Sequence, residues 1–94
     1  MEFEFINLKC SIVYNNILED YIIYIPEKKL KLSYNKILEF NTSGNAQIIG
    51  YNSDGTKCLI QSIQNYIEIG CVKIFDYEFK KQCLTIKKLL KCQN

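Results

Sequence analysis

The 94-residue chain has no histidine, arginine or tryptophan, and its 12 lysines against 10 acidic residues give a net charge of +2. Without imidazole there is no base near neutral pH, no Cys-His or Ser-His nucleophile pair and no mixed Cys/His metal site. Without guanidinium there is no bidentate fork for phosphate or guanine. We therefore expect no enzyme, no cofactor, no metal and no small-molecule substrate.

Apolar and polar residues alternate with a period of two through most of residues 2–75, which predicts short antiparallel strands. The predicted strands cover residues 2–14, 21–25, 30–34, 37–40, 46–51, 56–63 and 66–75. Turns are predicted at 15–16, 26–29, 42–45 and 52–55, where Asn, Pro, Gly and Asp residues gather. Asp54-Gly55 between two apolar runs is the strongest of these hairpin signals.

Two of the predicted strands contain an irregularity. The alternation changes phase between Phe5 and Ile6, which indicates a bulge or a strong twist. Gly70 interrupts the last strand and suggests a bulge or a close approach of another backbone.

From Asp76 to Cys92 the spacing of apolar residues becomes helical. On a wheel of roughly 100° per residue, one face carries Phe79, Cys83, Ile86, Leu89 and Leu90. Leu84 falls on the other face, among lysines, and Asp76 is the predicted N-cap. An amphipathic helix over 76–92 is the main prediction, with a strand around 84–86 as the alternative.

These elements predict a mainly β fold with one C-terminal helix, of the α+β class, as a single domain over residues 1–94. Six or seven short strands would form an antiparallel meander, curled or closed into a small barrel, with the helix 76–92 packed on it. An incomplete barrel leaves edge strands, and the flat, uncharged segment 21–25 would suit pairing with a second copy. A homodimer is thus one expected state.

The cysteines are too widely spaced for a zinc site, whose ligands come in close pairs. They stand at positions 10, 58, 71, 83 and 92. Their odd number, with an acidic N-terminus unlike a signal peptide, predicts reduced thiols in a cytoplasmic protein. Cys83 and Cys92 have lysines nearby in sequence and are the only candidate reactive thiols. The composition, rich in Ile, Lys, Asn and Tyr, also indicates an AT-rich genome.

Two features suggest binding to another macromolecule. The first is a lysine face on the C-terminal helix, made of Lys80, Lys81, Lys87, Lys88 and Lys91. The second is the tyrosines, of which Tyr21 and Tyr24 are the main candidates, since tyrosine is enriched at protein interfaces. We expect a protein-binding module that occludes its partner, such as an inhibitor, immunity or anti-CRISPR type of protein or an accessory subunit. The alternative is a single-stranded nucleic-acid binder that uses exposed tyrosines and the lysine face. No membrane contact is expected.

Overall fold

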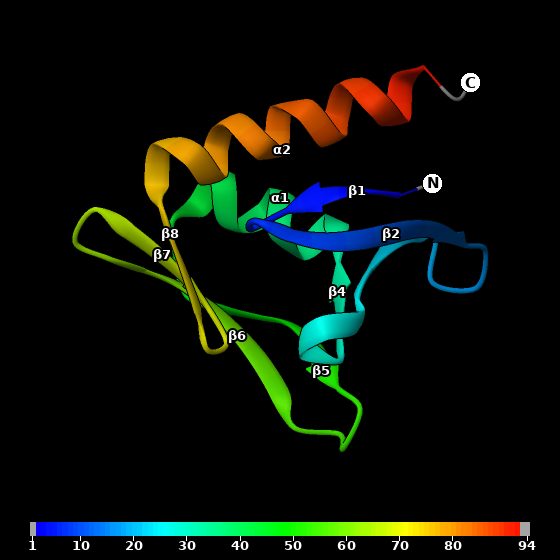
Figure 1. Ribbon diagram of the computed structural model, residues 1–94, viewed down its shortest axis with the longest axis horizontal. Coiled ribbons are helices and arrows are strands. Elements are labelled where there is room, and N and C mark those ends of the chain that lie inside the picture. The colour runs from blue at the N-terminus through cyan, green and yellow to red at the C-terminus, as the bar shows by residue number, and fades with distance from the viewer. Residues whose placement is uncertain (1, 93–94) are drawn as a thin grey trace.

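The computed structural model describes residues 2–92, and its eight strands form one antiparallel sheet in which every strand pairs with its neighbours in sequence (Figure 1). The strands are β1 (Glu2–Phe5), β2 (Leu8–Asn15), β3 (Asp20–Ile25), β4 (Leu30–Ser33), β5 (Gln47–Asn52), β6 (Lys57–Ile63), β7 (Tyr66–Ile69) and β8 (Val72–Phe75). A 3-10 turn η1 (Pro26–Lys28) joins β3 to β4, and the helices are α1 (Tyr34–Ser43) and α2 (Asp76–Lys91). Within residues 2–92, β1 does not pair with β8, so the sheet is curled and open. The predicted fold class is confirmed.

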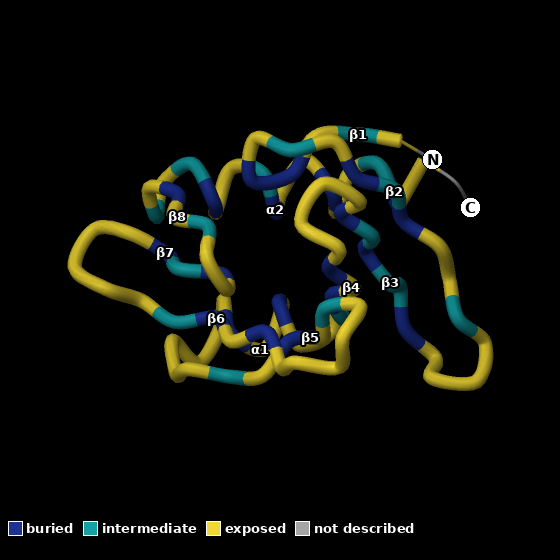
Figure 2. Tube along the Cα trace, turned by 60° about the horizontal axis from the view of Figure 1, so that its bottom comes forward, coloured by how far each residue is buried: buried dark blue, intermediate teal, exposed yellow. Residues whose placement is uncertain are grey.

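The core lies inside the curl because alternate residues of each strand point inward. Buried and exposed segments alternate along the strands in Figure 2. The fully buried side chains of the strands include Phe5, Ile23, Ile25, Leu32, Ile49, Ile60 and Ile69. The period of two in the sequence therefore marks the inward face correctly.

The first predicted strand, 2–14, is in fact two strands joined by a tight turn. Ile6 and Asn7 both have positive φ, 51° and 64°. That is the backbone of a two-residue hairpin turn whose twist matches the flanking strands. Ile6 is a β-branched residue in a region such residues rarely adopt. It is held there by burial and by its N–H, which donates to Gln82 Oε1 of α2 at 2.6 Å.

The last predicted strand, 66–75, is also two strands. Gly70 has φ 59° and lies in the turn between β7 and β8, so it is a turn glycine rather than a bulge. Its N–H donates to Leu59 O at 2.9 Å. The Asp54-Gly55 turn is confirmed between β5 and β6. The meander consequently has eight strands, where six or seven were predicted.

The predicted strand 37–40 is wrong, because these residues belong to helix α1. Ser33 caps the helix: its Oγ accepts from Lys36 N at 3.2 Å and donates to Asp20 Oδ2. The Asp20 carboxylate also accepts from Asn35 N at 3.0 Å. A side chain at the start of β3 thus fixes the beginning of α1, a contact that local alternation does not reveal.

Helix α2 begins at Asp76 and ends at Lys91, which confirms the predicted helix and rules out a strand at 84–86. Asp76 is the first helical residue and Phe75 the N-cap, so the predicted cap is displaced by one residue. The buried residues of α2 are Phe79, Cys83, Ile86 and Leu90. Leu89 is half-buried and Leu84 is exposed.

Phe79 joins α2 to the rest of the core. Its ring lies 6.0 Å from that of Phe5 in β1 and 6.1 Å from that of Phe40 in α1, centroid to centroid. The side chain is fully buried. Such tilted aromatic contacts contribute beyond their area, so this cluster fixes how α2 is rotated on the sheet.

We expect Gly50→Ala to destabilise the fold strongly. A Cβ at Gly50 would lie 1.9 Å from Lys31 O, in the backbone of the neighbouring strand β4. Relieving that clash requires β4 and β5 to separate, at a cost of about 2–3 kcal/mol in the free energy of unfolding. Urea denaturation measures it, with exposed Ser53→Ala as the control. A change below about 0.5 kcal/mol in the Gly50 variant, the range of ordinary surface substitutions, would contradict this account.

Candidate interaction surfaces

All five predicted lysines are exposed on the outer face of α2. At 100° per residue these lysines fall within an arc of roughly 120° around the helix axis. The arc faces solvent, because the buried residues of α2 occupy the opposite face. Leu84 lies at the middle of that arc, and Tyr77 falls within the same arc in the first turn, about 10 Å away along the helix axis. Their side chains are 60% and 67% exposed. We use the term lysine face for these five lysines together with Leu84 and Tyr77.

The lysine face is electrostatically unbalanced. Residues 2–92 contain one ion pair, between Lys36 Nζ and Glu39 Oε2 at 3.3 Å. It lies on α1, so it does not involve the lysine face. The acidic residues of α2, Asp76 and Glu78, stand in its first turn. Along the rest of the helix no lysine lies within ion-pair distance of a carboxylate of residues 2–92, so its potential attracts acidic groups.

A stack of three exposed aromatic rings continues this surface onto the sheet. Tyr66 and Phe75 lie opposite each other on β7 and β8, with ring centroids 4.6 Å apart. Phe75 in turn stacks on Tyr77 at 5.6 Å. The exposed apolar area therefore runs from the start of α2 across two strands.

The predicted tyrosines do not belong to the lysine face. Tyr21 is half-buried, and its ring meets Tyr14 at 5.0 Å and Tyr34 at 6.3 Å, which places it between β2 and α1. Tyr24, also half-buried, has Lys31 Nζ 5.7 Å from its ring centroid. The five lysines are thus brought together, whereas the two tyrosines lie on β3 among other neighbours.

The sequence analysis missed an apolar tip on the β2–β3 hairpin. Ile17 and Leu18 are 93% and 63% exposed in the turn. Asn15 Oδ1 orders this turn by accepting from both N–H groups, at 3.0 and 2.9 Å. The available signal was two adjacent aliphatic residues between Asn15-Asn16 and Glu19-Asp20, where a turn is normally polar.

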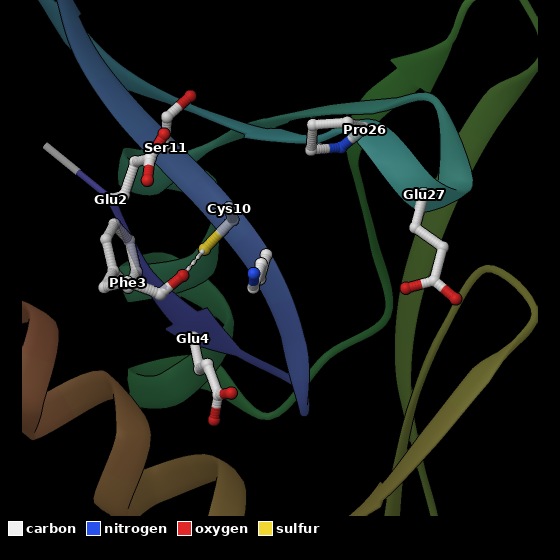
Figure 3. Close-up of a pocket in the computed structure, with 8 residues that line it drawn as sticks. Glu2, Phe3, Glu4, Cys10, Ser11, Pro26 and Glu27 are labelled. Carbon is white, nitrogen blue, oxygen red and sulfur yellow. Dashed lines mark hydrogen bonds between the residues drawn. The ribbon is translucent and has the colours of Figure 1, made fainter.

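A hollow of about 640 Å³ lies beside β1, β2 and η1 (Figure 3). Its lining residues are Glu2, Phe3, Glu4, Lys9, Cys10, Ser11, Pro26 and Glu27. The Cys10 thiol donates to Phe3 O at 3.3 Å, and burial raises its pKa to about 12. A thiol that stays protonated near neutral pH is a poor nucleophile, so Cys10 is not an activated thiol.

The other thiols divide into buried and exposed groups. Burial raises the pKa of Cys58 and of Cys83 to about 11, whereas Cys71 and Cys92 are exposed. Cys83 is therefore not the activated thiol that its lysine neighbours in sequence suggested. All five cysteines are free, and residues 2–92 contain no cluster of metal-ligating side chains.

No protein-family model, curated protein or solved structure matches this chain. Over residues 2–92, neither helix has the length and apolar character needed to cross a membrane.

We expect iodoacetamide to distinguish the two groups of thiols. With a pKa near 11, the thiolate fraction of Cys83 at about pH 8 is roughly one in a thousand, and burial blocks access as well. Cys71 and Cys92 should therefore be alkylated in the folded protein, and the other three only after unfolding in urea. Peptide mass spectrometry after a timed quench measures this. Labelling of Cys83 as fast as Cys92 would contradict the burial described here.

Proposed function

We propose that this protein binds another protein and works by covering part of its surface, as an inhibitor, immunity or anti-CRISPR type of protein, or as an accessory subunit. The observation that carries the proposal is the lysine face, in which exposed Leu84 lies among five lysines that form no ion pair within residues 2–92, with exposed Tyr77 in the first turn of the same helix. Protein interfaces have this anatomy, with an apolar centre that provides affinity and a polar rim that provides steering.

The lysine face specifies the chemistry of the partner. An acidic surface with an apolar depression would accept Leu84 and Tyr77 while its carboxylates meet the lysines. A head-to-head dimer through this face is disfavoured, because two-fold symmetry would place one set of five lysines against the other. The partner is therefore a different, acidic protein.

A cytoplasmic location fits this proposal. All five cysteines are free and three of them are buried core residues, which suits a reducing compartment. Contact alone is sufficient for occlusion, and the raised pKa values of Cys10, Cys58 and Cys83 keep these thiols out of nucleophilic chemistry.

The proposal is tested by capture of the partner with tagged protein from the cells that produce it. We expect Leu84→Asp to weaken binding about 30-fold, because it removes the apolar centre of the contact. The double variant Lys87→Glu/Lys88→Glu should have an effect of similar size, because it reverses the charge of part of the rim. The double variant Lys28→Glu/Lys29→Glu at η1 also reverses two exposed neighbouring lysines, so it is the matched charge control and should retain binding. Titration calorimetry on the purified pair gives the affinities, and thermal melts confirm that each variant folds.

A captured protein whose affinity is unchanged by both lysine-face variants would overturn the proposal. The variant Ile17→Asp separates the two exposed apolar surfaces. Loss of binding in that variant alone would place the contact at the hairpin tip instead of on α2. Light scattering gives the oligomeric state, and a dimer abolished by Leu84→Asp would make a second copy the occupant.

A further inference from the structure

Tyrosine and lysine alternate in a straight row across four adjacent strands. In the register of the sheet, Tyr24 of β3 lies opposite Lys31 of β4, Lys31 opposite Tyr51 of β5, and Tyr51 opposite Lys57 of β6. Directly opposed residues project from the same face of a sheet. That face is the outer one, because the strand neighbours of these residues, such as Ile23 and Leu32, fill the core. We call these four residues the Tyr/Lys row.

The side chains of the row are accessible and their charges are unpaired. Lys31 and Lys57 are exposed, Tyr51 is 51% exposed and Tyr24 is half-buried. Neither lysine forms an ion pair within residues 2–92, where the one ion pair joins Lys36 and Glu39. Strands lie about 4.8 Å apart, so the two tyrosines are separated by roughly 10 Å with one ammonium group between them.

We infer that the Tyr/Lys row is a binding site for single-stranded nucleic acid. A dinucleotide carries one phosphate between two bases, as the row carries Lys31 between Tyr24 and Tyr51. Bases stack on the two rings, and phosphates approach Lys31 and Lys57. The Lys31 stem is flexible enough to leave the Tyr24 ring, over which its Nζ lies at 5.7 Å, when a phosphate is present.

This site is independent of the lysine face and differs from it in chemistry. The row supplies two separated rings with a cation beside each, which matches a strand of unpaired bases. A duplex has no free base faces to offer, so it should bind only through its phosphates. With lysine in place of arginine there is no bidentate contact to guanine, so the binding has little sequence preference.

The test is fluorescence anisotropy with a labelled oligothymidylate of about 12 nucleotides, a length near the upper range for one small β-barrel site. At about 50 mM salt, Tyr51→Ala should weaken binding about tenfold, because one stacked base loses its ring. Tyr51→Phe keeps the ring and should bind within about twofold of the wild type. These substitutions lie at an exposed position, and thermal melts verify the fold.

Salt dependence tests the lysines. The double variant Lys31→Ala/Lys57→Ala should reduce the slope of log affinity against log salt by about 1.4, which is about 0.7 for each lost contact to a single strand. Lys73→Ala on the outer face of β8 is the matched control and should leave both affinity and slope unchanged.

Three results would overturn the inference. They are an absence of binding up to about 100 μM protein at low salt, equal affinity for a duplex of the same length, and loss of binding in Lys87→Ala/Lys88→Ala but not in Tyr51→Ala. The variant Leu84→Asp should still bind the oligonucleotide. Failure of this inference therefore leaves the proposed protein contact untouched, and the converse also holds.

Discussion

The contact of Phe79 with Phe5 and Phe40 is the constraint on which the arrangement of this molecule depends. It joins α2 at once to the first strand and to α1, three segments that are far apart in the chain. Because Phe79 is fixed inward, the helical period fixes Cys83, Ile86 and Leu90 inward as well. The lysines therefore lie on the outer face of α2. Leu84 lies among them and is exposed for the same reason.

Much of this arrangement was predictable from the sequence, but only where a single local signal decides it. The period of two identified the inward residues of the strands, and Asp54-Gly55 identified a hairpin. The face of α2 followed from its apolar spacing. Helix α1 was not predictable in this way, since its start depends on the Asp20 carboxylate, which reaches Ser33 and Asn35 from another strand. The turn at Ile6 similarly depends on Gln82, at the opposite end of the sequence.

The two candidate surfaces also differ in how far the sequence predicts them. Five lysines within 12 residues of one helix are visible in the sequence. The Tyr/Lys row is not, because its members come from four strands and are aligned only by the register. A shift of register between Ile48 and Gly50 on β5 sets which residue faces Lys57. A slip of one residue would turn Tyr51 toward the core and remove the row.

The two proposed surfaces also lie on different elements, the row on β3–β6 and the lysine face on α2. Helix α2 and strand β5 stand at opposite ends of the view in Figure 1. Under the two proposals, the protein partner and the nucleic acid contact different elements of the molecule.

The order of the strands has a consequence for how the chain reaches this structure. Every ladder joins successive strands, separated by a short turn or, between β4 and β5, by helix α1, so each pairing closes a local loop and loses little chain entropy. A topology with such local contacts is expected to fold fast for a β protein. The exception is the junction of the two chain ends, where the Ile6–Gln82 bond spans 76 positions. Docking of the C-terminal helix thus closes the longest of these loops, and the same contact sets the orientation of the lysine face.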